Sequence, residues 1–358
     1  MTIDAVISAF ELQAVWCDEM QSPFTAGLMR AAAADMRQGG PVAALIGDWP
    51  GNPVADALMM RFAGALHSAA LTKRDEKLAA LYPDTNRDWR MDAVWPAALD
   101  FIKRDEAWVR AFLTSPPQTN ETRRAIALLP GFLELARLGP LHLLEIGASA
   151  GLNQSWDRFR YETATWSFGE KGGPWIDTDW HGPAPADLDV KPIVASRAAC
   201  DQNPLDVRNP EHVARLEAYI WADQFDRMTR LHAAIDLARA NNIQVERSDA
   251  AAWLQRKLEG PLPEGVTVIF HSVVWQYLTR ETRDAIIEAI TQAAARADEG
   301  HRLAWLRYEP LRALGAEGPV EIMGTGLRLW PSATDASQTR ILARGDGHAR
   351  HVVLEQPA

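Results

Sequence analysis

The sequence after residue 140 alternates short apolar runs with helical patterns, and this alternation limits the possible folds more than any other feature. Strand-like runs occur at 141–146, 193–196, 243–246, 266–270 and 303–308. Helical patterns lie among them at 211–240, 249–258 and 280–297. Strands joined through helices are parallel, because the crossover is right-handed and returns to the same sheet. The pattern therefore predicts an α/β fold with a mostly parallel sheet.

The end of the chain predicts antiparallel strands. The runs 321–330, 338–344 and 348–354 are strand-like, and Gly345-Asp346-Gly347 between the last two is a hairpin signal. The stretch 169–192 is rich in Pro and Gly, so we expect an insertion at about 160–192 between the first two strands.

Residues 1–138 show helix signals and no strand pattern. Ser22 and Pro23 are typical of a helix start. Thr119 and Asn120 can cap a later helix. A stripe at helical spacing, expected to be buried, consists of Val54, Leu58, Phe62 and Leu66. The expected organisation is a helical N-terminal domain at 1–138 and a Rossmann-like domain at 139–358.

Charge and cysteine content limit the classes of partner. The chain has 37 Lys and Arg against 47 Asp and Glu, a net charge of −10, which disfavours binding to nucleic acid or to anionic membranes. Its 2 cysteines, far apart in sequence, suit a reducing compartment. No apolar run is long enough to span a membrane. We expect a cytoplasmic protein that acts on a small molecule, and the oligomeric state stays open.

Polar residues follow the predicted strands, where ligands of open α/β sheets bind. They are Glu145 and Gly147, Cys200 and Asp201, Ser248 and Asp249, His271 and Ser272, and Tyr308 and Glu309. Helix capping is an alternative role for Asp249 and Ser272. The strongest motif is Glu145-Ile-Gly147-Ala-Ser149-Ala-Gly151-Leu-Asn153, whose small residues let backbone N–H groups approach a ligand, although any tight turn favours them too.

Four runs carry a family resemblance across nearly the whole chain. They are Gln118-Thr-Asn-Glu121, the glycine motif Glu145 to Asn153, Asp201-Gln-Asn-Pro-Leu-Asp206 and His271-Ser-Val-Val-Trp275. They resemble the bacterial domain-of-unknown-function 2332 family. The glycine motif, Asp201 and Asp249 also resemble the first motifs of class I S-adenosylmethionine-dependent methyltransferases. The resemblance implies a helical part followed by a methyltransferase-like, seven-stranded Rossmann domain, and the family brings no established reaction.

The methyltransferase resemblance implies roles by position, with S-adenosylmethionine as cofactor. Glu145, Gly147 and Gly151 would face its methionine part, Asp201 the ribose and Asp249 the adenine amino group. Ser149 stands where such folds often have another glycine. The predicted cofactor site also includes Asn153 and Ser272.

Methyl transfer to a hydroxyl or ammonium group needs a base. His271, which ends the fourth predicted strand, is the first candidate, with a buried structural histidine as the alternative. Glu309 and Tyr161 are secondary candidates.

Two other functions remain open. Gly147-Ala-Ser149-Ala-Gly151 matches the nucleophile motif of serine hydrolases, with Asp249 and His271 in the matching chain order. That fold, however, places strands before the motif. The other alternative is a ligand-binding protein that keeps the fold without catalysis.

The substrate side is predicted from polar and aromatic residues. Asn120 and Glu121 are either helix caps or substrate contacts. The chain has 14 Trp, and we expect Trp156 and Trp275 to line the pocket. We also expect Trp166, Trp175 and Trp180, which follow the glycine motif, to border the pocket as part of an aromatic lid or wall. The run Asp177-Thr-Asp179-Trp-His181 has metal-ligand residue types but few oxygens, so a solvated loop and no metal are expected.

Overall fold

The computed structural model describes residues 2–86, 88–319, 321–331 and 339–355. The chain forms two compact units, which are described separately. The first consists of Met1–Thr119 with Asn209–Thr229, and the second of Asn120–Arg208 with Arg230–Ala358. None of the helices in the described ranges has the length and apolarity that a membrane crossing needs.

The first unit is built from helices around an apolar core, as the sequence predicts. They are α1 (Ile3–Glu19), α2 (Pro23–Arg37), α3 (Pro41–Ile46), α4 (Leu58–Leu71), α5 (Glu76–Leu81), α6 (Met91–Arg104), α7 (Glu106–Leu113) and α9 (Pro210–Ala218). α2 starts with Pro23, as expected, but the Ser22 hydroxyl bonds to Thr25 Oγ1 and to Asp223 instead of a backbone N–H. The prediction of a buried helical stripe is wrong at Val54, which precedes α4 and is 45% exposed.

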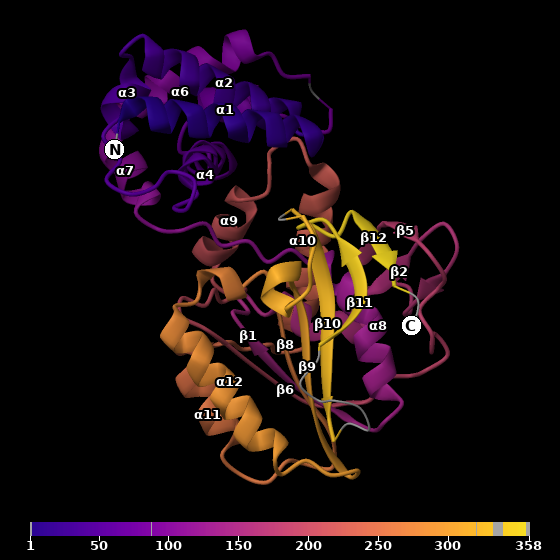
Figure 1. Ribbon diagram of the computed structural model, residues 1–358. Helices are drawn as coiled ribbons and strands as arrows, with labels where there is room; N and C mark the ends of the chain where they lie inside the picture. Colours follow the sequence, from indigo (N-terminus) through magenta and orange to yellow (C-terminus); the bar gives the residue numbers. More distant parts are fainter. Residues whose placement is uncertain (1, 87, 320, 332–338, 356–358) are drawn as a thin grey trace. The chain divides into compact units, whose positions relative to one another are not determined.

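The second unit contains a nine-stranded, mostly parallel sheet (Figure 1). Its strands, in spatial order, are β5 (Asp179–His181), β12 (His351–Leu354), β11 (Arg340–Gly345), β10 (Met323–Trp330), β9 (His301–Pro310), β8 (Gly265–Ser272), β1 (Leu141–Ile146), β6 (Val194–Asp201) and β7 (Glu246–Arg247). β7, β6, β1, β8 and β9 are parallel, whereas β10, β11 and β12 form an antiparallel meander. The predicted α/β fold with antiparallel C-terminal strands is confirmed.

Helices cover both faces of this sheet (Figure 1). α8 (Arg124–Ala136) packs on the face that carries Leu143 and Phe270. α11 (Ala250–Leu258) and α12 (Arg280–Ala294) pack on the opposite face. Successive residues of a strand point to opposite sides of the sheet. Because the buried strands are continuous apolar runs, both faces of the sheet are apolar. The second unit also contains the short helices η1 (Leu152–Arg158), η2 (Trp275–Tyr277) and η3 (Leu311–Leu314), and a small sheet of β2 (Arg160–Glu162), β3 (Ser167–Phe168) and β4 (Trp175–Asp177).

Several sequence expectations need correction. The sheet has nine strands instead of the seven of the methyltransferase-like sheet, and β5, from the insertion, is the strand that no predicted run covers. The helix expected at 211–240 is two helices, α9 and α10 (Phe225–Ala240), the second of which runs across the boundary between the units. Thr119 and Asn120 cap no helix: α8 starts at Arg124, and Asn120 contacts the glycine motif. Residue 338, at the start of a predicted strand, lies outside the described residues.

Candidate functional site

The central strand β1 marks the point where the strand order reverses. The chain passes from β1 to β6 and β7 on one side, and then to β8 and β9 on the other. Such reversals open a crevice at the carboxyl ends of parallel strands. Two loops meet there, 147–151 after β1 and 273–274 after β8, and we treat them as the candidate site.

The loop after β1 has an unusual backbone. Gly147, Ser149 and Gly151 all have positive φ, at 65°, 54° and 70°. A Cβ atom on Gly147 would lie 2.5 Å from Val274 Cγ2, so glycine allows the two loops to touch. Asp201, at the end of β6, accepts a hydrogen bond from Ser149 N at 2.8 Å and thereby fixes the loop.

The loop after β8 is strained. Val273 has φ 57°, which is rare for a β-branched residue. Glu309 holds this conformation, because its Oε1 accepts from Val274 N at 2.8 Å and from Trp275 N at 3.2 Å. Strained backbone that neighbours hold in place is typical of functional sites.

His271 is fully buried under this loop. Trp305 Nε1 donates to its Nε2 at 3.2 Å, so Nδ1 carries the proton and donates to Glu309 Oε1 at 2.7 Å. Trp275 stacks on the ring, with centroids 5.6 Å apart. Both ring nitrogens are therefore engaged, and in this arrangement neither can take a proton from a substrate.

Several buried polar atoms near the two loops have no hydrogen-bond partner within the described ranges, among them Ser149 Oγ, Asn153 Oδ1 and Glu309 Oε2. Burying a polar atom without a partner costs about 1–3 kcal/mol. Such atoms are explained when a ligand or water supplies the missing partner.

Glu145 points into the protein. The residue is 4% exposed, and its carboxyl accepts a hydrogen bond from Gln154 Nε2 at 3.1 Å. Burial raises the pKa of Glu145 to about 8, with the Gln154 hydrogen bond opposing and Asp201 adding to the rise. The side chain is therefore mostly protonated at neutral pH and supports η1.

The predicted substrate residues divide into two groups. Asn120 Oδ1 accepts from Leu152 N at 3.0 Å, and the Glu121 carbonyl accepts from Asn153 Nδ2 at 3.4 Å, so both contact the glycine motif. Trp156, in contrast, is fully buried and stacks on Phe132 at 4.1 Å between centroids.

The other predicted residues have local roles in the structure. Tyr161 OH donates to Trp156 O at 2.8 Å, and burial keeps the pKa of Tyr161 well above 10. Asp249 caps α11, because its Oδ1 accepts from Ala251 N and Ala252 N. The backbone carbonyl of Ser272 accepts a hydrogen bond from Arg124 Nη1 at 3.5 Å. No sequence pattern singled out Arg124, which reaches the site from α8.

These features define the class of protein: a Rossmann-like α/β protein with two constrained loops at the carboxyl ends of its parallel strands. The chain belongs to the family described as "Uncharacterized protein conserved in bacteria (DUF2332)", whose sequence profile matches residues 7–353. This confirms the family resemblance. No curated protein and no solved structure matches the chain.

Proposed function

We propose that the protein binds S-adenosylmethionine at the edge formed by the loops after β1 and β8 and methylates a small molecule. The observation that carries the proposal is the group of buried, unpartnered polar atoms Ser149 Oγ, Asn153 Oδ1 and Glu309 Oε2 at the strand reversal. A nucleoside cofactor with hydroxyl, amino and carboxylate groups matches such a mixed set.

Two carboxylates, Asp201 at the end of β6 and Asp249 shortly after β7, have oxygen atoms available to this cofactor. Asp201 is partly exposed, and its two oxygens each accept one backbone N–H, from Ser149 and Asn203, which leaves lone pairs for ribose hydroxyls. Asp249 is exposed and caps α11 through Oδ1, so its Oδ2 is available to an adenine amino group. Glu145 supports η1 in this proposal, because its side chain is buried.

When bound, S-adenosylmethionine would supply its methyl group to an acceptor atom aligned opposite the sulfur, and S-adenosylhomocysteine would be the leaving group. We assign the role of proton acceptor to Glu309 through its unpartnered Oε2, while His271 holds Oε1 and positions the carboxylate. Arg124 brings a positive charge near Glu309, and burial lowers the pKa of its guanidinium.

The serine hydrolase alternative lacks its triad in this geometry. Ser149 Oγ has no hydrogen-bond partner among the described residues, and both nitrogens of His271 are engaged elsewhere. Asp249 caps a helix. We therefore expect no labelling of Ser149 by a fluorophosphonate.

Calorimetry of the full chain with S-adenosylmethionine and S-adenosylhomocysteine tests the proposal. We expect one binding site per chain. Asp249→Asn should still cap α11, since Asn is as good a cap as Asp, but it places an NH₂ group against the adenine amino group and should weaken binding at least tenfold. The matched control is Asp298→Asn, which lies before β9 and accepts from Gly300 N and His301 N.

Absence of binding by both compounds refutes the cofactor proposal. Binding without methyl transfer to carboxylate, amine or phenol acceptors favours the non-catalytic alternative. Glu309→Gln keeps an acceptor for the loop, so it should retain cofactor binding and lose transfer.

A further inference from the structure

A second cluster of reactive side chains lies at the outer end of the sheet, away from the candidate site. β5 and β12 are parallel neighbours there, with His351 opposite Asp179 and Val353 opposite His181. Residues two apart on a strand share a face, so Asp179 and His181 point to the same side as His351. The insertion and the C-terminal strand thus bring three metal-ligand side chains together.

The three side chains converge on one point. His181 Nε2 and His351 Nδ1 each lie 3.1 Å from the same oxygen, Asp179 Oδ2. The two imidazole centroids are 4.5 Å apart, and the ligand atoms of all three residues lie within 4.8 Å of one another. A tetrahedral zinc ion with bonds of about 2.0–2.2 Å places its donor atoms roughly 3.3 Å apart. The two nitrogen–oxygen separations already match this value.

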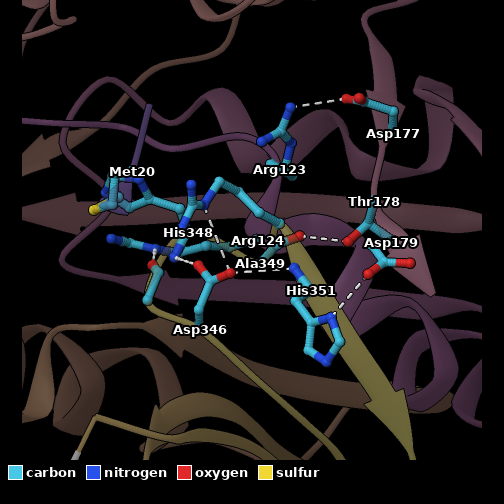
Figure 2. Close-up of polar contacts among 12 residues, drawn as sticks. Met20, Arg123, Arg124, Asp177, Thr178, Asp179, Asp346, His348, Ala349 and His351 are labelled. Atoms are coloured by element: carbon cyan, nitrogen blue, oxygen red, sulfur yellow. Dashed lines mark hydrogen bonds and ion pairs between the residues drawn. The ribbon is translucent and has the colours of Figure 1, made fainter. Parts of the chain in front are cut away.

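The backbone on both sides of the cluster is well fixed. Asp179 N donates to Arg350 O at 2.9 Å, and Thr178 Oγ1 donates to Ala349 O at 2.7 Å. Figure 2 shows the second of these contacts beside the pair of Asp179 and His351. Ligand positions are therefore set by strand pairing before any ion arrives.

Side-chain packing behind β5 and a hydrogen bond at the start of β12 also hold the cluster in position. Trp180, on the opposite side of β5, is 8% exposed and packs edge-to-face on Trp166 at 4.9 Å. Asp346 Oδ2 accepts from His351 N at 3.1 Å, which anchors the start of β12 (Figure 2).

We propose that Asp179, His181 and His351 form a binding site for a divalent transition-metal ion, best matched by Zn²⁺. Two imidazole nitrogens and one carboxylate oxygen suit such ions, whereas Ca²⁺ and Mg²⁺ prefer oxygen ligands. All three side chains are about half or more exposed, so water completes the coordination. The ion fastens the insertion to the C-terminal strand at the sheet edge.

The sequence alone favours a solvated loop because only Asp179 and His181 are close in the chain. Strand pairing supplies the third ligand from the other end of the sequence. A comparison pair exists at Asp298 and His301, whose side chains are also exposed and 2.9 Å apart. Among the described residues, the β5–β12 cluster brings three metal-ligand side chains together, whereas the pair of Asp298 and His301 belongs to no such group of three.

Calorimetry with ZnCl₂ on untagged, chelator-treated full-length protein tests the proposal. We expect one saturable site per chain, with affinity at least tenfold lower in His181→Ala and in His351→Ala. The control His301→Ala should retain the wild-type affinity. The ligands are exposed, so the variants should fold; circular dichroism checks this, and His351→Gln replaces any variant that does not.

Thermal unfolding gives an independent readout, because an ion that binds only the folded chain raises the melting temperature. ZnCl₂ should raise it for wild type and His301→Ala, and much less for His181→Ala. Lack of saturable binding, or equal affinity in wild type and both ligand variants, overturns the proposal.

Discussion

The buried carboxyl of Glu145 makes the stability of the second unit depend on pH, and Glu145→Gln should remove this dependence. Glutamine has nearly the same shape and can still accept the hydrogen bond from Gln154 Nε2 that Glu145 accepts at 3.1 Å. The substitution therefore changes the titration of this position while it leaves its packing in place.

The magnitude follows from the pKa of the Glu145 carboxyl, which burial raises from 4.5 to about 8. Below pH 4.5 the carboxyl is protonated in both states and adds no pH dependence. Between pH 4.5 and 8 the unfolded chain releases the proton and the folded chain keeps it, so stability falls as pH rises. At ~1.36 kcal/mol per pH unit, the loss reaches about 5 kcal/mol above pH 8, of which about 3 kcal/mol falls between pH 6 and 9.

Urea unfolding followed by circular dichroism at pH 5, 6, 7, 8 and 9 measures this effect. The free energy of unfolding of Glu145→Gln minus that of wild type should grow by about 3 kcal/mol from pH 6 to 9. Other groups titrate equally in both proteins and cancel. The control Glu170→Gln, at an exposed position, should follow wild type. A difference that stays constant over this range refutes the reasoning.

Two further predictions concern a buried histidine and the strained loop. Burial lowers the pKa of His67 from 6.5 to about 4, so the contribution of His67 to stability is full above pH 6.5 and falls by about 3 kcal/mol toward pH 4. In urea titrations at pH 7, 5 and 4, the free energy of unfolding of wild type minus that of His67→Gln should therefore fall by about 3 kcal/mol from pH 7 to 4. Val273→Gly should raise the free energy of unfolding by about 1 kcal/mol by relieving the positive φ, while Val274→Ala should lower it by about 1–2 kcal/mol because Val274 packs on Gly147. Destabilisation by Val273→Gly in thermal or urea unfolding contradicts the strain argument.

The parallel core could be predicted because its sequence signals are local. Each buried strand is a continuous apolar run, and a helix pattern follows most of them, so order and direction come from chain connectivity. The same reasoning gave too few strands. β5 is 3 residues long and lies in a Pro- and Gly-rich insertion, and its place in the sheet depends on pairing with β12.

The sequence predicted the position of the candidate site better than the roles of its individual residues. Residues after the strands do collect at one edge, since parallel strands share a direction. Their hydrogen bonds are set by tertiary contacts that no local pattern encodes. His271 illustrates this, because the neighbouring strand β9 supplies both Glu309 and Trp305, which engage its two nitrogens.

Glu309 connects the strain of the β8 loop to the chemistry of the site. Its Oε1 bonds to two backbone N–H groups and His271, so ordering of the loop and orientation of the free Oε2 depend on one carboxylate. Val273 is held at positive φ by the same loop geometry and by its own N–H bond to Tyr308 O at 2.9 Å. A ligand that bonds to Oε2 therefore also acts on the backbone of this loop. Because Val274 in turn lies against Gly147, we expect a ligand bonded to Oε2 to affect the loop after β1 as well, so that substitutions in either loop change its affinity.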